Sequence, residues 1–331
     1  MKEGNVFQQG IDGGSKEKEN LVIVGSGPAA WTAALYAARA EVGPLVFAGV
    51  NQGGPRGGQL TTTQTVENYP GFPHGVGGSE LIQLMEQHAR VYETRVLEED
   101  VIDITGDAGQ FIIHGTKSRV ETRAIILATG ASAKRLDIEG DKEFWNRGIS
   151  ACAVCDGALP IFRGKILMVI GGGDSACEEA LYLTKFGNIK LVLRGGKFRA
   201  SKIMQKRVLN NPKIDVTFFH VVEKALGEEF LEKVLLKDVK TGQRREEAVS
   251  GLFYAIGHNP NTEFLKSLKD RVELNESGYI VTQESTHTSL DGCFAAGDVT
   301  SANVPYRQAI TAAAMGCKAA LNVERWLEEQ S

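Results

Sequence analysis

The sequence lacks three features, and each absence excludes a class of protein. No apolar stretch approaches the ~20 residues needed to span a bilayer, so we expect no transmembrane segment. A net charge of −4 over 331 residues provides no basic field for nucleic acid or an anionic membrane surface. The five cysteines are an odd number and do not resemble a secreted disulfide framework. They favour a reducing, cytoplasmic setting, in which two neighbouring cysteines are more often catalytic than structural.

The rest of the composition is that of ordinary globular domains. Hydrophobic residues make up 42% of the chain and charged residues 24%, and 331 residues are enough for two domains with separate cores. Residues 1–20 are polar and contain no apolar stretch of the kind found in signal peptides. They predict a flexible tail.

Two short apolar strands each run directly into a glycine-rich turn. Residues 21–24 precede Gly-Ser-Gly-Pro-Ala-Ala at 25–30, and residues 166–170 precede Gly-Gly-Gly-Asp-Ser-Ala at 171–176; a helical segment follows each turn. The glycines allow the backbone to approach a pyrophosphate closely, and the helix N-terminus adds its positive end. The duplication predicts an α/β protein with two Rossmann-like dinucleotide-binding domains.

The first of these turns suits a flavin better than NAD. NAD sites often carry an acidic residue about twenty positions after the turn, where it binds the ribose. Here the corresponding strand ends at Ala48. The missing acid weighs against a plain NAD site and is compatible with a flavin site.

Between the two turns lies Cys152-Ala-Val-Cys155, followed directly by Asp156. Two cysteines at this spacing can close a disulfide and reopen it as thiols, and a neighbouring carboxyl group is well placed to pass protons. A zinc half-site is the rival interpretation, but zinc needs four ligands. The other three cysteines are scattered and no histidines are paired at ligand spacing, so we expect no metal site. A dithiol between two dinucleotide sites indicates an electron-transfer chain.

Two arginines lie just past a strand of the second unit. Arg194 and Arg199 bracket Gly-Gly-Lys-Phe at 195–198. Basic residues at this position can bind the 2′-phosphate that distinguishes NADPH from NADH. A solvated basic loop is an equally good interpretation of the same pattern.

With these motifs, the chain closely resembles the low-molecular-weight thioredoxin reductases from about Leu21 to Leu327. The segments that carry the resemblance are 25–40, 57–73, 128–136, 150–157, 171–183, 198–204, 253–262 and 295–317. The resemblance implies FAD bound by a discontinuous domain, residues 21–133 and 259–331. Residues 134–258 would form the second nucleotide-binding domain, which carries the two cysteines. It also implies a homodimer whose two domains rotate relative to one another during turnover.

The resemblance further implies a role for individual residues. Cys155 would be the thiol nearest the flavin, Cys152 the thiol that exchanges with a partner disulfide, and Asp156 the proton donor. The residues that would bind FAD are Gly25, Gly27, Ala30, Gln59, Asn68, Asp298, Arg307, Gln308 and Ala309. Those that would bind the second dinucleotide are Gly171, Gly173, Ala176, Arg194 and Arg199.

One departure from the family concerns this second dinucleotide. Members that use NADPH carry His-Arg-Arg-x-x-x-Arg around its 2′-phosphate, whereas residues 193–199 here read Leu-Arg-Gly-Gly-Lys-Phe-Arg. We therefore expect a weakened NADPH site, and the occupant is either NADPH or a second FAD.

The main hypothesis is a thioredoxin reductase-like flavoprotein that moves two electrons between FAD and the Cys152–Cys155 disulfide. From there the electrons pass to a protein disulfide, of thioredoxin or of another dithiol protein. In one alternative the electrons enter from ferredoxin or a second flavin, or run from thiols to the flavin. A non-catalytic dinucleotide-sensing protein is the other alternative, and the intact Cys152, Cys155 and Asp156 argue against it.

Overall fold

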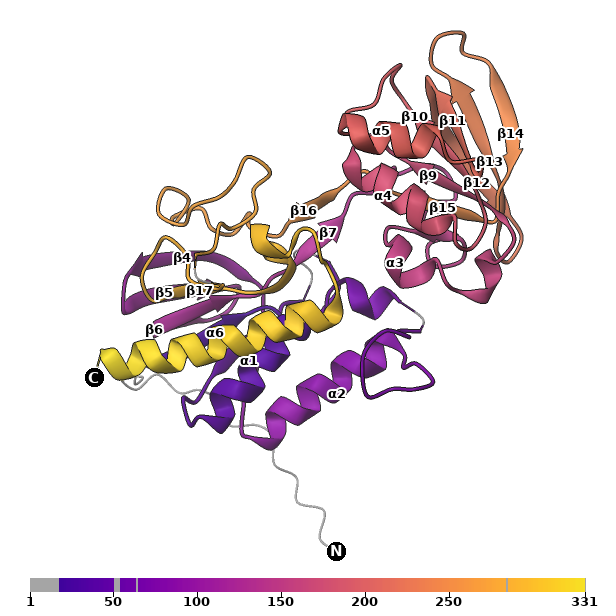
Figure 1. Cartoon of the computed structure of the whole chain (residues 1–331). Helices are drawn as coiled ribbons and strands as arrows, with labels where there is room; N and C mark the ends of the chain where they lie inside the picture. Colours follow the sequence, from indigo (N-terminus) through magenta and orange to yellow (C-terminus); the bar gives the residue numbers. More distant parts are fainter. Residues whose placement is uncertain (1–17, 51–53, 64, 284, 331) are drawn as a thin grey trace, which may run out of the picture.

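The computed structural model describes residues 18–50, 54–63, 65–283 and 285–330, and it divides into two lobes (Figure 1). The expected polar tail, residues 1–20, lies outside the described residues except for its last three positions. Two of these, Glu19 and Asn20, already belong to strand β1. Among the described residues, no helix has the length and apolar character that a membrane crossing requires.

The first lobe is built on a seven-stranded sheet in the order β3-β2-β1-β6-β5-β4, with β17 paired to the end of β6. Strands β1, β2, β3, β6 and β17 run parallel, whereas β4 and β5 form an antiparallel extension. Helices α1 and α6 lie against one face, with α2 beside α1 (Figure 1). The bounds are Glu19–Val24 (β1), Pro28–Arg39 (α1), Leu45–Phe47 (β2), Gly78–Val91 (α2), Arg95–Leu97 (β3), Val101–Asp107 (β4), Gln110–Gly115 (β5), Arg119–Leu127 (β6), Cys293–Ala295 (β17) and Ala309–Glu329 (α6). Short 3-10 helices lie at Gln59–Thr62, Gly297–Val299 and Ser301–Asn303.

Strand β1 is buried on both of its faces. Leu21 and Ile23 belong to the core that the sheet shares with α1 and α6, while Val22 and Val24 belong to the core on the opposite face. A parallel sheet covered on both sides favours a continuous apolar run over alternation. The predicted strand, turn and helix are therefore confirmed for this unit.

The second lobe repeats the arrangement with a five-stranded parallel sheet in the order β11-β10-β9-β15-β8. A three-stranded antiparallel sheet, β12-β13-β14, adjoins it. The bounds are Ile149–Ser150 (β8), Ala153–Asp156 (α3), Ile166–Ile170 (β9), Asp174–Leu183 (α4), Asn188–Leu193 (β10), Lys202–Leu209 (α5), Ile214–Phe218 (β11), His220–Gly227 (β12), Leu231–Asp238 (β13), Arg244–Ala248 (β14) and Gly251–Tyr254 (β15), with a 3-10 helix at Pro160–Phe162. Two strand–glycine turn–helix units, one in each lobe, confirm the predicted α/β class.

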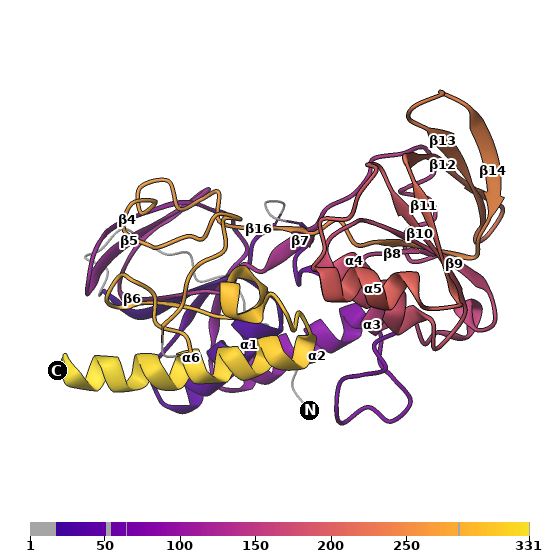
Figure 2. The ribbon, with the colours of Figure 1, turned by 45° about the horizontal axis from the view of Figure 1, so that its top comes forward.

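Two short strands run between the lobes. β7 (Ala131–Ala133) and β16 (His258–Pro260) pair antiparallel, and Figure 2 shows them bridging the gap between the two sheets. The proposed domain boundaries, at residues 133/134 and 258/259, fall at this strand pair.

The first glycine turn depends on the absence of a side chain at Gly25. Its φ of +132° lies in the region that favours glycine, and an added Cβ would lie 2.2 Å from the carbonyl oxygen of Ala128. Since that oxygen belongs to the backbone leaving β6, it cannot move without disturbing the sheet. Gly25 is therefore required by the fold itself, before any ligand is considered.

We predict that Gly25→Ala lowers the thermal unfolding midpoint and weakens FAD retention. The unfavourable φ alone costs about 1–3 kcal/mol, and the backbone clash adds to it. Differential scanning fluorimetry, with and without added FAD, measures both effects. Gly27→Ala is the matched control, because its Cβ would meet only the carbonyl oxygen of Gly57, at 3.9 Å. Its apoprotein should unfold at the wild-type temperature, and an equally stable Gly25→Ala would contradict the argument.

Candidate active site

A cavity of about 1070 Å³ lies between the two lobes. It is larger than most small-molecule sites, which span ~300–1,000 Å³, and residues of both lobes line it. Of the residues predicted to bind FAD, all except Ala30 line it: Gly25, Gly27, Gln59, Asn68, Asp298, Arg307, Gln308 and Ala309. Ala30 is fully buried in α1 behind the turn. The second lobe contributes Cys152, Cys155 and Asp156 to the same cavity.

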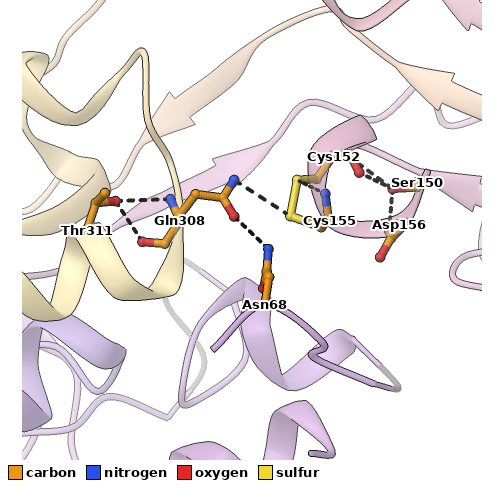
Figure 3. The surroundings of a disulfide bond; sticks show 7 residues. All are labelled: Asn68, Ser150, Cys152, Cys155, Asp156, Gln308 and Thr311. Carbon is orange, nitrogen blue, oxygen red and sulfur yellow. Dashed lines mark hydrogen bonds between the residues drawn. A yellow bond between two sulfur atoms is a disulfide. The ribbon is translucent and has the colours of Figure 1, made fainter. Parts of the chain in front are cut away.

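Cys152 and Cys155 form a disulfide at the start of α3. Cys152 is the N-cap of this helix, and its Sγ accepts the amide hydrogen of Cys155 at 3.2 Å. Across the lobe boundary, the Gln308 amide Nε2 lies 4.0 Å from Cys155 Sγ, and Asn68 Nδ2 donates to Gln308 Oε1 at 3.1 Å (Figure 3). Cys155 is thus the sulfur that faces the FAD-binding lobe.

Asp156 lies in the next position of α3, with its carboxyl group held by Ser150. The Ser150 hydroxyl donates to Asp156 Oδ2 at 2.5 Å and accepts the amide hydrogen of Cys152 at 3.0 Å (Figure 3). Burial raises the pKa of Asp156, and the Ser150 hydrogen bond partly offsets this by lowering it. A carboxyl group of raised pKa beside a disulfide is suited to hold and pass a proton. The sequence motifs did not reveal Ser150, because nothing local marks a serine six residues earlier as the partner of Asp156.

Comparison with known proteins gives a consistent answer. Residues 19–316 match the family described as pyridine nucleotide-disulphide oxidoreductase. The chain is 51% identical to "Thioredoxin reductase 1, mitochondrial" of Arabidopsis thaliana over 96% of its own length and 86% of that protein. A solved thioredoxin reductase from Giardia duodenalis superimposes with a TM-score of 0.87 at 41% identity, covering 93% of this chain and 98% of the other. The chain belongs to the low-molecular-weight thioredoxin reductase family.

Two further matches differ from these, one in the length of the relative and one in the TM-score. The chain is 48% identical to "NADPH-dependent thioredoxin reductase 3" of Arabidopsis thaliana, but spans only 58% of that protein's length. The Lactococcus lactis thioredoxin reductase titled "FR conformation" matches at 38% identity over 94% of this chain, yet its TM-score is 0.62. Identity and coverage are thus similar to those of the Giardia duodenalis structure, whereas the TM-score is lower.

The cavity has the features that family membership requires for FAD. Helix α1 begins at Pro28 without a side-chain cap, which leaves its first amide hydrogens available to a pyrophosphate. Asp298 lines the cavity and accepts a hydrogen bond from Asn303 Nδ2 at 2.6 Å, and burial raises its pKa. The buried Nε of Arg307 has no hydrogen-bond partner among the described residues. A polar ligand in the cavity would satisfy these groups, so the residues fit the cofactor.

The residues predicted to bind the second dinucleotide do not line this cavity, although Ser175 beside them does. Gly171 and Gly173 lie in the turn between β9 and α4, Ala176 lies in the first turn of α4, and Arg194 and Arg199 are exposed on the loop after β10. None of these five lines the cavity with the disulfide. The amides of Arg199 and Ala200 donate to Gly172 O at 2.7 and 3.1 Å, which holds the basic loop against the glycine turn.

Glu179 of α4 is a second residue that the sequence motifs did not reveal. It lines the cavity, and its Oε2 is buried without a hydrogen-bond partner among the described residues. Burial raises its pKa to about 8; the nearby Ala153 amide and the Arg307 charge lower it, and the Glu178 charge raises it. Its environment depends on the packing of α3 against α4, which no local pattern in the sequence encodes.

We predict that in Ser150→Ala the reduction of the disulfide stays fast up to a higher pH than in wild type. Without the serine hydroxyl, burial acts on the pKa of Asp156 unopposed, and Asp156 remains protonated over a wider range. Asp156→Asn removes the proton donor and should slow the step by about 10²-fold or more. Single-turnover reduction of the disulfide, followed from pH 6 to 9.5, measures both. Superimposable profiles for wild type and Ser150→Ala would contradict the proposed control of Asp156.

Proposed function

We propose that the protein is a thioredoxin reductase, which passes two electrons from FAD through Cys152–Cys155 to the disulfide of a thioredoxin-like protein. The observation that carries the proposal is the position of the disulfide. It lies in a cavity lined by the FAD-binding turn, and Cys155 faces the first lobe, where Gln308 Nε2 lies 4.0 Å from its Sγ (Figure 3). The names of the relatives support thioredoxin as the partner. A dinucleotide sensor would have no use for a disulfide with a buried carboxyl group beside it.

Opening the disulfide takes two electrons, and a full dithiol takes two protons as well. FAD, when bound, supplies the electrons, because it can accept a hydride and exchange electrons with a disulfide. The S–S bond breaks, and Asp156 delivers a proton to the dithiol that forms. The amide hydrogen of Cys155 already points at Cys152 Sγ, and the Gln308 amide points at Cys155 Sγ. Both can stabilise negative charge on sulfur.

Cys152 then attacks the partner disulfide and forms a mixed disulfide, which releases one partner sulfur as a thiol. Cys155 attacks Cys152 in turn, so that the Cys152–Cys155 bond re-forms and the second partner sulfur leaves with its proton. Both cysteines are half-buried in this arrangement. We propose that the lobes turn about the β7–β16 pair to expose Cys152; the lower TM-score of the Lactococcus lactis structure titled "FR conformation" supports a second arrangement of the lobes.

The second dinucleotide is NADPH in this proposal, bound at the Gly171–Ala176 turn with a reduced hold on its 2′-phosphate. Arg194, Lys197 and Arg199 are exposed beside the turn and supply positive charge. Leu193 lies in the buried core of the second lobe, so its position offers no phosphate contact. Four further expectations stay predictions: a second FAD, a ferredoxin donor, a homodimer and a cytoplasmic location.

We predict that Cys155→Ser and Cys152→Ser each abolish reduction of a protein disulfide while FAD remains bound. Cys155→Ser should also stop electron exchange with FAD, whereas Cys152→Ser should keep a thiol beside Gln308. Coupled thioredoxin–insulin turnover and the FAD absorbance of the purified protein measure the two properties. Cys317→Ser, in α6, is the matched control and should retain turnover. Wild-type turnover in either active-site variant would refute the assignment.

We also predict that Gly195→Arg tightens NADPH binding by about tenfold, because one charge-assisted hydrogen bond to phosphate is worth about 1.5–3 kcal/mol. The substitution fits, since a Cβ at Gly195 would have no atom within 4 Å. Gly196 could not serve, because its Cβ would lie 2.2 Å from the Phe219 ring. Anaerobic titration with NADPH and NADH measures the effect, and NADH should be unaffected. Gly195→Gln is the neutral control; micromolar, NADPH-selective binding by the wild type would contradict the weakened site.

A further inference from the structure

Four exposed cations of the second lobe are without a counter-charge. Arg194, Lys197 and Arg199 belong to the loop after β10, and Lys240 belongs to the turn after β13. Cations on strands β12, β13 and β14 form ion pairs with glutamates at 2.6 to 3.4 Å. Among the residues that the structure describes, no carboxylate lies within ion-pair distance of the other four. Positive charges that no carboxylate neutralises favour an anion between them.

Backbone hydrogen bonds join the turn that carries Lys240 to the basic loop, residues 194–199. This loop already contacts the glycine turn between β9 and α4. The Phe219 amide donates to the Gly195 carbonyl oxygen at 3.3 Å, and the Val239 amide donates to the Phe219 carbonyl oxygen at 2.8 Å. Lys240 follows Val239 directly. The turn after β13 is therefore attached to the basic loop through Phe219.

The side chain of Phe219 makes a second connection between the same two segments. The centroid of its ring lies 3.4 Å from the Lys240 ammonium nitrogen, and a cation over the face of an aromatic ring is attracted by the ring's quadrupole. The tip of the ring fits against Gly196, where an added Cβ would lie 2.2 Å from the Phe219 Cζ. The ammonium group of Lys240 thus rests on a ring that contacts the basic loop.

Phe219 occupies this position at a conformational cost. Its φ of +59° is in the left-handed region, which bulky residues rarely adopt. Such conformations persist where the surrounding contacts fix them, and they cluster at ligand sites. The turn after β13 is fixed as well, because Asp238 Oδ1 accepts the amide hydrogens of Lys240 at 2.7 Å and Thr241 at 3.1 Å. The ring and the cation above it are therefore held in one arrangement.

We propose that Lys240 determines the preference of the second dinucleotide site for a 2′-phosphate, and that Phe219 positions its ammonium group beside the basic loop. The proposal rests on the function proposed above and concerns only how this dinucleotide is recognised. Leu193 and Gly195 provide no cation, whereas Lys240 reaches the loop from a different sheet. An ammonium group is a point charge without the two-pronged geometry of an arginine, so its contribution is compatible with a reduced hold on the phosphate.

The experiment is isothermal titration calorimetry of the purified flavoprotein with NADP⁺ and NAD⁺. These two nucleotides differ only in the 2′-phosphate, and neither can reduce oxidised FAD. Lys240→Gln should weaken NADP⁺ binding by about five- to tenfold, between the effects of an exposed ion pair and a charge-assisted hydrogen bond. NAD⁺ binding should not change. An unchanged ratio of the two affinities in Lys240→Gln overturns the proposal.

Two further variants separate the charge of Lys240 from a general effect on the sheet. Lys240→Arg keeps the positive charge and should retain most of the preference for NADP⁺. Lys233→Gln is the matched control, because it removes a cation near the opposite end of β13, and it should bind both nucleotides as the wild type does. A loss of preference in Lys233→Gln equal to that in Lys240→Gln also overturns the proposal.

The role of Phe219 has its own test. Phe219→Leu keeps apolar bulk against Gly196 but removes the aromatic face, so the preference for NADP⁺ should fall in the same direction as in Lys240→Gln. A wild-type preference in Phe219→Leu overturns the positioning role of the ring. If this variant does not fold, the variants of the exposed Lys240 decide through salt: their difference from wild type should shrink as sodium chloride rises from about 0.05 to 1 M.

Failure of this proposal and failure of the proposed function give different results. If both nucleotides bind and the ratio of their affinities does not depend on Lys240, only the role of Lys240 is refuted. If neither nucleotide binds the purified flavoprotein, the dinucleotide assigned in the proposed function is refuted as well.

Discussion

Burial of carboxyl groups along the cavity between the lobes is the constraint on which the chemistry of this protein depends. Three carboxyl groups, on Asp156, Glu179 and Asp298, have their pKa raised chiefly by burial. In water all three would be ionised at neutral pH. In the cavity, burial favours the protonated form of Asp156 next to a disulfide that needs protons to open. Residues of both lobes line the cavity in which this carboxyl group lies.

In the proposed mechanism, the same cavity wall is also the surface that opens. The direct contacts across it include two polar ones: the Gln308 amide near Cys155 Sγ, and the Asn146 side chain on the Thr62 carbonyl oxygen. Hydrogen bonds of this type exchange with water at little net cost, typically about 0.5–1.5 kcal/mol each. A large apolar contact would hold the lobes together more strongly. Polar contacts around a two-stranded connection therefore suit a protein whose disulfide alternates between a cofactor and a partner.

The parts of the site that sequence could predict are those with local physical causes. The two glycine turns could be predicted because two backbone segments that approach closely leave no space for a side chain. At Gly25, the segment that approaches is the one carrying the Ala128 carbonyl oxygen. The Cys152–Cys155 spacing is readable because the chemistry requires two nearby sulfurs. Ser150 and Glu179 were not readable, since their roles arise from the packing of β8 and α4 around α3. The parallel sheets followed from apolar runs, whereas the antiparallel β12-β13-β14 sheet carried no comparable signal.

The loop after β10 shows how structure changes the meaning of a departure seen in sequence. The sequence alone presents Leu193 and Gly195 as two losses from a phosphate-binding block. In the structure they differ: Leu193 belongs to the core, whereas Gly195 faces open space, and the neighbouring Gly196 makes room for the Phe219 ring. Phe219 itself adopts a φ of +59°, and the centroid of its ring lies 3.4 Å from the Lys240 ammonium nitrogen. Restoring the full block would therefore disturb the packing at Leu193 but not at Gly195, so one of the two departures is set by the core of this lobe and the other lies on its surface.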